Sequence, residues 1–508
     1  MLLVYPNSYF VGMSNLGFQA IYYQLNQRPD TYCQRLFLDS SPLVSLEKGW
    51  PVNNFDIIAF SIPFELDYLN ILKILDLAAI PLKGAERSDG YPLIIAGGIA
   101  VSANPEPLSE FIDLFVLGEG EEVVHELIDA YKAVRSQLSS PKHRQAGRTG
   151  REEALKKLAE VEGIYVPRFY HVSYNENGTV KAIETEDAPG KVRRRWVKDI
   201  DRYRTASHIL TKGTEFGDMY LIEISRGCSE NCYFCLAGYA YRPWRVRSLE
   251  KVFQEIEEGR KHRERIGFIS TLASRHPQIE KICSKVLETK GKVSLASLRP
   301  GTLSKTLIEA MDRSGQRTLT LAPETGKEAL RRTLNKNVSD EEILKSVELV
   351  ADFTVPNLRL YFIIGLPGED DDDIVAIADL VGKIRKRLFV SKKPGKITVS
   401  VNPFVPKAST SFQGMRMEEG KTLSRRLKIL KKELRNLKNI NFIHESVKWS
   451  LWQGILSRGD RRLGNVLLST YRWEGDWRRA LREEGLDESF YLRRGRSAEE
   501  IFPWAHLD

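Results

Sequence analysis

The sequence predicts an α/β protein in which a doubly wound parallel sheet is followed by a second parallel sheet and a small helical C-terminal segment. In the first part, four apolar runs are too continuous for strands with one exposed face, so buried parallel strands are expected. In the second part, six strand-like runs alternate with helical stretches, which is typical of parallel strands joined by helices. The expected segments are 1–135, 136–215, 216–415 and 416–508.

The first sheet is expected to bind a ligand at the carboxyl ends of its strands, where doubly wound sheets form a crevice. Gly97, Gly98 and Gly118 follow two of these strands, and glycine lets the backbone approach a ligand closely. The predicted strands are 1–6, 55–61, 92–98 and 114–118, and the predicted helices are 16–25, 68–79 and 121–134.

A connecting segment follows. Residues 136–150 are polar, basic and poor in apolar side chains, which indicates an exposed loop. Short strands are expected at 161–167 and 170–183, with a turn at Asn177-Gly178, as in a hairpin between the two sheets. Residues 192–197 are expected to form a strand with a basic edge.

The second sheet is expected to carry a site where its strands end, as parallel strands with outer helices do. A predicted helix at 341–351 illustrates the intervening pattern. The predicted strands are 221–224, 266–270, 293–297, 318–322, 358–364 and 397–401.

The C-terminal segment begins with one apolar helical stripe, formed by Leu423, Leu427, Leu430, Leu434 and Leu437. Its other faces carry seven Lys and Arg residues between 425 and 438. Two interpretations stay open: a helix packed on the sheet with solvated cations, or a nucleic-acid groove. A Trp-rich helical tail follows, which is expected to cover the mouth of the second sheet.

Cys228, Cys232 and Cys235 form a C-x3-C-x2-C cluster. Three thiolates on one short loop suit three corners of an iron–sulfur cube and leave the fourth iron open for a small molecule. A structural zinc site needs four ligands, and the two remaining cysteines, Cys33 and Cys283, are isolated. Five cysteines in 508 residues also argue against a disulfide framework and fit a reducing compartment.

With Phe234 at the aromatic position, the cysteine loop resembles the C-x3-C-x-aromatic-C signature of the radical S-adenosylmethionine (SAM) enzymes. The resemblance implies a [4Fe-4S] cluster whose open iron is chelated by SAM, with Phe234 placed against adenine. It also implies reductive cleavage of SAM to a 5′-deoxyadenosyl radical, and it makes the six strands a partial (β/α)6 barrel.

Further positions match the same family. The resemblance places Arg299 on the SAM carboxylate, Glu324 on its ribose or amino group, and Ile364 and Gly365 against adenine. One departure is clear. Many members carry Gly-Gly-Glu after the second strand, and this turn holds the amine of SAM. This chain instead has Ser-Thr-Leu-Ala-Ser-Arg-His at residues 270–276, so the residues that bind the SAM amine are not identified.

The first segment resembles the cobalamin-binding domains that precede many radical SAM cores. Gly97-Gly98 and the turn from Gly118 and Glu119 to Glu121 match the glycine turns of that domain. Its D-x-H-x-x-G motif is absent, because Asn15 stands at the histidine position, where it is also suited to cap a helix. Cobalamin binding and a cofactor-free domain that only shapes the site both stay open.

Further short segments carry a resemblance beyond these domains: Val11-Gly-Met-Ser14, Glu106-Pro107, Tyr241-Arg-Pro243, Asn335-Lys-Asn337, Pro403-Phe-Val-Pro406 and Ser457-Arg-Gly-Asp-Arg461. On these residues, nearly the whole chain resembles a bacterial branch of cobalamin-domain radical SAM proteins. The resemblance implies an enzyme that transfers a methyl group from methylcobalamin to an unactivated carbon. It also implies a partner that supplies electrons, such as flavodoxin or ferredoxin. Two alternatives are a cobalamin-free enzyme that modifies RNA or another macromolecule, and a non-enzymatic iron–sulfur protein for electron transfer or RNA binding. A methylthiotransferase would need three more cysteines for a second cluster. The substrate and the catalytic residues are not indicated; Tyr239, Tyr241 and Cys283 are candidates by chemistry alone.

The net charge of +9 permits an acidic or nucleic-acid partner without requiring one. No stretch is apolar and long enough to cross a membrane, and the first residues enter a predicted strand directly. A cytoplasmic location is therefore expected.

Overall fold

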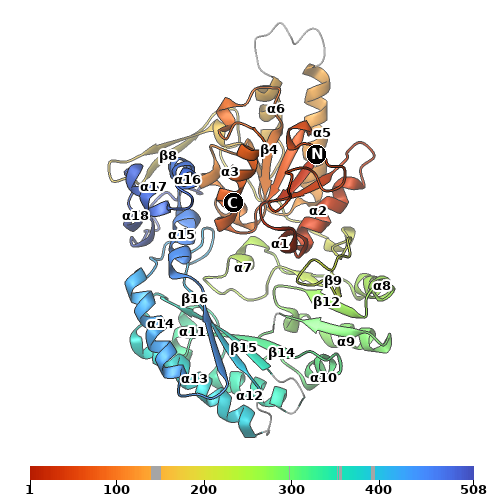
Figure 1. Ribbon diagram of the computed structural model, residues 1–508, viewed down its shortest axis with the longest axis vertical. Coiled ribbons are helices and arrows are strands. Elements are labelled where there is room, and N and C mark those ends of the chain that lie inside the picture. The colour runs from red at the N-terminus through yellow and green to blue at the C-terminus, as the bar shows by residue number, and fades with distance from the viewer. Residues whose placement is uncertain (139–149, 297, 352, 354–356, 391–394) are drawn as a thin grey trace.

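The structure is a computed structural model that describes residues 1–138, 150–296, 298–351, 353, 357–390 and 395–508. Two α/β parts lie one above the other, and helices from the C-terminal segment run along one side of both (Figure 1). The predicted α/β class is confirmed. None of the helices in the described residues has the length and apolar character needed to span a membrane.

The first part is a sheet with the order β2-β1-β3-β4-β5-β6, in which the first five strands are parallel and β6 is antiparallel. Its strands are β1 (Leu2–Tyr5), β2 (Gln34–Phe37), β3 (Ile57–Ser61), β4 (Leu93–Gly97), β5 (Leu114–Val116) and β6 (Ile164–Tyr165). Its helices are α1 (Tyr9–Met13), α2 (Leu16–Asn26), α3 (Tyr68–Leu77), α4 (Ile99–Ala103), α5 (Gly120–Leu138) and α6 (Gly150–Ala159).

All four strands predicted for this sheet are present, and one further strand, β2, was missed. β2 escaped prediction because it contains Gln34 and Arg35, yet all four of its residues are buried. Burial of Arg35 is offset by an ion pair with Glu47 at 2.7 Å. The strand expected at 161–167 is β6, which pairs with β5 and not with the hairpin.

The connecting segment contains the predicted hairpin, formed by β7 (Tyr170–Tyr174) and β8 (Val180–Thr185). Gly178 in its turn has φ +80°, which favours glycine. Residues 192–197 are not a strand: Val192 and Arg195 make only isolated bridges, with Leu507 and Gly118. Most of the predicted loop at 136–150 lies outside the described residues.

The described residues of the second part form seven parallel strands in two groups, in the orders β13-β12-β9 and β14-β15-β16-β17. A parallel bridge between Leu298 and Leu321 links the groups, so the strands form a partial barrel. The strands are β9 (Met219–Glu223), β12 (Arg265–Ile269), β13 (Lys292–Leu295), β14 (Thr318–Glu324), β15 (Asn357–Ile364), β16 (Ile397–Pro403) and β17 (Ile440–His444).

The six predicted strands of this part are present, although Ser297 at the end of the third lies outside the described residues, and β17 is an additional edge strand. It was missed because it follows directly on the leucine-rich helix and its last two residues are exposed. The outer helices are α8 (Leu249–Arg260), α9 (Ile279–Glu288), α10 (Lys305–Arg313), α11 (Glu328–Thr333), α12 (Asp340–Ala351), α13 (Asp371–Val390) and α14 (Gly420–Leu434).

The C-terminal segment joins the two parts. Four of the predicted stripe leucines are buried on α14, and Leu437 is half-buried just beyond its end. The tail helices contact the first part: Asn104 donates hydrogen bonds to the carbonyls of Ser457 and Gly459, and Arg461 pairs with Glu106 at 2.9 Å. These helices are α15 (Val447–Arg458), α16 (Leu463–Arg472), α17 (Trp477–Glu483) and α18 (Glu488–Leu492).

Candidate active site

The cysteine loop begins just past the carboxyl end of β9. Its first residues form β10 (Ser225–Arg226), which pairs with β11 (Arg245–Val246), and α7 (Leu236–Ala240) follows the last cysteine. Gly227 between β10 and Cys228 has φ +81°, and a Cβ there would lie 2.4 Å from the carbonyl oxygen of Tyr241. This turn therefore requires glycine.

Cys228, Cys232 and Cys235 are free and half-buried. Burial raises the pKa of all three thiols, that of Cys232 to about 12, so a bound metal has to displace their protons. Within the described residues no group of three Cys, His, Asp or Glu side chains is gathered for a single metal ion. As donors, three thiolates on one loop fit an iron–sulfur cluster.

Phe234 lies in an apolar cluster next to the cysteines. Ile363 belongs to this cluster, whereas its neighbour Ile364 is fully buried in the main core, since successive residues of a strand face opposite sides. Gly365 follows with φ +78°, and its amide donates a hydrogen bond to Glu369 at 2.5 Å. The cluster also contains Leu330, Leu334, Leu366, Phe404 and Phe412.

Arg299 is buried against the cysteine loop. Its guanidinium forms an ion pair with Glu230, which lies between the first two cysteines, and donates a hydrogen bond to the carbonyl of Asn337 at 2.7 Å. Its backbone amide donates to the hydroxyl of Ser274 at 3.1 Å. The guanidinium is therefore held at the edge of the loop by partners from the chain itself.

Glu324 ends β14 with φ +67°, an uncommon conformation for a residue other than glycine. Its carboxylate accepts a hydrogen bond from the ammonium of Lys336 at 2.5 Å. Both side chains are about nine-tenths buried and act electrostatically on Cys232 and Cys235. Such backbone strain is common at binding sites.

The segment after β12, for which no amine-binding residues were predicted, also reaches the site. The hydroxyls of Ser270 and Ser225 are hydrogen-bonded at 2.7 Å. His276 is buried, and its Nδ1 accepts a hydrogen bond from the amide of Gln278 at 3.2 Å. Burial lowers the pKa of His276 to about 4, so the ring is neutral at physiological pH.

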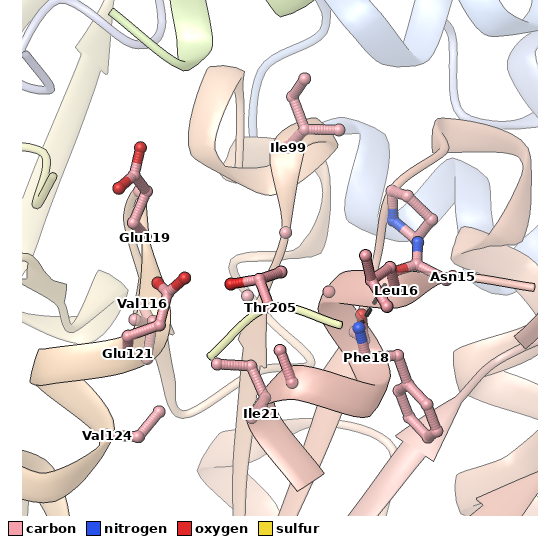
Figure 2. A pocket seen from close by; sticks show the side chains of 18 of the residues that line it. Asn15, Leu16, Phe18, Ile21, Ile99, Val116, Glu119, Glu121, Val124 and Thr205 are labelled. Carbon is pink, nitrogen blue, oxygen red and sulfur yellow. Dashed lines mark hydrogen bonds between the residues drawn. The ribbon is translucent and has the colours of Figure 1, made fainter. Parts of the chain in front are cut away.

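A cavity of about 460 Å³ lies between the carboxyl ends of both sheets (Figure 2). Gly97, Gly98 and Gly118 line it from the first sheet, and Ser225 and Ser270 from the second. Its apolar wall includes Leu3, Ala20, Ile21, Ile95 and Val124. The predicted ligand crevice of the first sheet thus opens toward the start of the cysteine loop.

Two of these glycines are required by close contacts. Gly98 has φ +117°, and a Cβ would lie 2.5 Å from the carbonyl oxygen of Ile62. Gly118 has φ +96°, and a Cβ would lie 2.1 Å from the carbonyl oxygen of Arg195. Since the contacted atoms are backbone, no side-chain movement would relieve a clash at either position.

Glu119 lines the cavity but is already engaged by the chain. Its carboxylate pairs with Arg245 at 2.6 Å and with Arg226 at 2.9 Å, and it accepts a hydrogen bond from the amide of Val197 at 2.8 Å. Burial alone would raise the pKa of Glu119, but the two guanidinium groups outweigh it and leave the pKa below its usual value. These partners were missed because they lie far from Glu119 in sequence.

Asn15 caps α2, as expected from its residue type: its side-chain oxygen accepts a hydrogen bond from the amide of Phe18 at 2.9 Å. It also lines the cavity (Figure 2). None of the described residues around the cavity is a histidine.

Of the three candidates named by chemistry alone, Tyr241 lines the cavity, and burial raises its pKa to about 12. The hydroxyl of Tyr239 is hydrogen-bonded to that of Ser411. Cys283 is buried in the core on α9.

Comparison with protein families gives two matches, which together cover more than half of the chain. Residues 17–167 match the family described as radical SAM proteins, N-terminal, and residues 222–381 match the radical SAM superfamily.

Among curated proteins, an uncharacterized protein of Methanocaldococcus jannaschii is 29% identical over 470 residues, which is 92% of this chain and 90% of that protein. The ribosomal protein uS12 methylthiotransferase RimO of Pelotomaculum thermopropionicum is 25% identical over 288 residues, 54% of this chain and 60% of RimO.

Two solved structures share the fold over most of this chain. The radical SAM methyltransferase TsrM from Kitasatospora setae, with cobalamin and a [4Fe-4S] cluster bound, has a TM-score of 0.56 at 13% identity and covers 95% of this chain and 98% of its own. The cobalamin-dependent radical SAM enzyme OxsB, with aqua-cobalamin bound, has a TM-score of 0.53 at 16% identity, with coverages of 93% and 66%.

The cysteine loop, the partial barrel and the two family matches agree with one another. The chain therefore belongs to the radical SAM superfamily of enzymes, which use a [4Fe-4S] cluster and SAM, and an N-terminal domain found in radical SAM proteins precedes its core.

Proposed function

We propose that the protein is a cobalamin-dependent radical SAM methyltransferase that acts on an unactivated carbon of its substrate. The observation that carries this proposal is the cavity between the carboxyl ends of the two sheets, which lies beside the start of the cysteine loop. A second cofactor in that cavity would be close to the site at which SAM is cleaved.

Cys228, Cys232 and Cys235 would hold three irons of the cluster. When bound, the cluster and SAM supply a 5′-deoxyadenosyl radical that activates the substrate. Arg299 would bind the SAM carboxylate by sharing its guanidinium between that group and Glu230. An external one-electron reductant such as flavodoxin or ferredoxin would be needed.

Glu324 would accept a hydrogen bond from the ribose or amino group of SAM. Lys336 donates a hydrogen bond to this carboxylate and holds it in position. Adenine would be contacted by the ring of Phe234 and by the backbone of Ile364 and Gly365. Phe234 and Ile363 belong to the same apolar cluster at this place.

The cavity suits a corrinoid for two reasons. Gly97, Gly98 and Gly118 present backbone without side chains, so a large flat ring could come close to the strand ends. The apolar wall suits the aromatic base of a nucleotide tail. When bound, cobalamin supplies a cobalt that carries the methyl group.

A second candidate function is modification of RNA without cobalamin. It is favoured by the exposed face of α14 and the residues just after it. Within the described residues, six exposed cations there form no ion pair: Lys421, Lys428, Lys431, Lys432, Arg435 and Lys438. Such a face suits a phosphate backbone.

The test is equilibrium binding of hydroxocobalamin to the anaerobically purified full-length chain, together with cobalt analysis and visible spectroscopy. Ala20→Phe fills the cavity from α2 and should abolish binding. Ala154→Phe is the matched control, because Ala154 lines a different cavity at the amino ends of β3 and β4. Absence of binding to the unmodified chain would refute the cobalamin proposal and leave RNA modification as the better candidate.

A further inference from the structure

We propose that Arg226 is a positioning residue through which the wall of the cavity sets the geometry of the cysteine loop. The inference rests on the proposed function in one respect, namely that the cavity holds a cofactor. The link itself is made by the chain and does not depend on which cofactor is present.

Arg226 stands two residues before Cys228, and the turn between them is closely packed. Gly227 in this turn lies against the backbone carbonyls of Tyr241 and Pro243, with an added Cβ at 2.4 and 2.9 Å from these oxygens. β10 is further tied to β11 by the pairing of Arg226 with Arg245. A displacement of Arg226 would therefore be passed on to Cys228.

Three buried carboxylates hold the guanidinium of Arg226. Glu119 and Glu121 come from the first part of the chain, at 2.9 and 2.6 Å, and Glu223 comes from the end of β9, at 2.8 Å. All four side chains are at most a tenth exposed. In such a dry environment these ion pairs are strong, and loss of one partner leaves an uncompensated charge.

The same carboxylates form the charged wall of the cavity. Glu119, Glu121 and Arg226 all line it, and Figure 2 shows Glu119 and Glu121 on one wall. A ligand in the cavity would contact this wall, and any shift of the two carboxylates would reach the loop through Arg226. By linkage, ordering of the loop by cluster and SAM would change the affinity of the cavity by the same factor.

Two further guanidinium groups belong to the network. Arg245 pairs with Glu119, and Arg247 pairs with Glu223 at 3.1 Å and with Asp201 at 3.8 Å. Replacing Glu121 by its amide keeps the shape of the side chain and removes one of the three negative charges that hold Arg226. The substitution should change the SAM affinity and the EPR spectrum of the cluster, although Glu121 itself lies on α5.

The experiment compares Glu121→Gln with Asp113→Asn in the full-length chain, reconstituted anaerobically with iron and sulfide. Asp113 is a buried carboxylate of the same domain that pairs with Arg87 and Arg151 but not with Arg226. Both substitutions should lower stability. Only Glu121→Gln should weaken SAM binding, by about 5- to 10-fold, and change the EPR spectrum of the reduced cluster.

Unchanged SAM affinity and EPR spectrum in Glu121→Gln would overturn the proposal, as would equal effects of the two substitutions. If Glu121→Gln does not fold, Arg226→Lys replaces it, because lysine keeps the charge and loses the planar fork that binds several carboxylates. These measurements are made without cobalamin, so they decide the role of Arg226 even if hydroxocobalamin fails to bind. If it binds, it should change the SAM affinity of the unmodified chain and not that of Glu121→Gln.

Discussion

Replacing Gly227 with alanine should prevent assembly of the cluster. Gly227 has φ +81°, and adopting this left-handed conformation costs a residue with a side chain about 1–2 kcal/mol. The added methyl would also lie 2.4 Å from the carbonyl oxygen of Tyr241 and 3.1 Å from the Cα of Trp244. Because these are backbone atoms of the segment that holds β11, the turn itself must move, and Cys228 moves with it.

Gly315→Ala is the matched control. Gly315 also has a left-handed φ, +67°, but a Cβ there would meet no atom within 4 Å. It should therefore show only the conformational cost, about 1–2 kcal/mol in the free energy of unfolding. The difference between the two variants isolates the steric contact at the loop.

The assay is iron and sulfide content with the visible spectrum after anaerobic reconstitution, and chemical unfolding measures stability. We expect the Gly315→Ala protein to hold a full cluster and the Gly227→Ala protein to hold little or none. A full cluster with normal SAM binding in Gly227→Ala would refute the claim that this turn positions Cys228.

Four further outcomes are expected. Cys232→Ala should abolish reductive cleavage of SAM, measured as 5′-deoxyadenosine, whereas Cys283→Ala should retain it because Cys283 only packs in the core; cleavage by Cys232→Ala would contradict the ligand assignment. Asn15→Ala should lower the free energy of unfolding by about 1 kcal/mol, because the cap of α2 is lost. Cob(II)alamin bound to the unmodified chain should show no EPR coupling to a histidine nitrogen, because none of the described residues that line the cavity is a histidine. Burial lowers the pKa of His276 to about 4 from an ordinary 6.5, so the unfolded chain binds more protons between these values. Stability should thus rise with pH through this window, and His276→Gln should flatten that rise in unfolding curves; an unchanged rise would show that other groups cause it.

Local patterns predicted most of the strands. Buried parallel strands such as β3 and β4 are short apolar runs, and their identity depends on a few consecutive residues. β2 and β17 do not follow this pattern. β2 contains the buried Arg35, whose charge is paired with Glu47, and β17 is an edge strand whose last two residues are exposed. Their strand state is decided by neighbouring strands.

The orientation of site residues was less predictable than their location. The segment expected to contact adenine, Ile364 and Gly365, lies at the end of β15, yet Ile364 faces the core and Ile363 joins the cluster of Phe234. A shift of one residue reverses the face of a strand, and an apolar pair of residues does not indicate which member faces the site.

The sequence by itself determined the cluster chemistry of this protein. All three thiols lie within residues 228–235, and the turn that presents them depends on the adjacent Gly227, so residue type and spacing carry the information. Only the tertiary structure decided what lies beside the loop. The cavity takes its walls from residues as distant as Leu3 and Thr271, and Arg226 finds Glu119 and Glu121 across more than a hundred positions. Contacts of that kind are set by how two sheets pack at their carboxyl ends, and no local pattern records them.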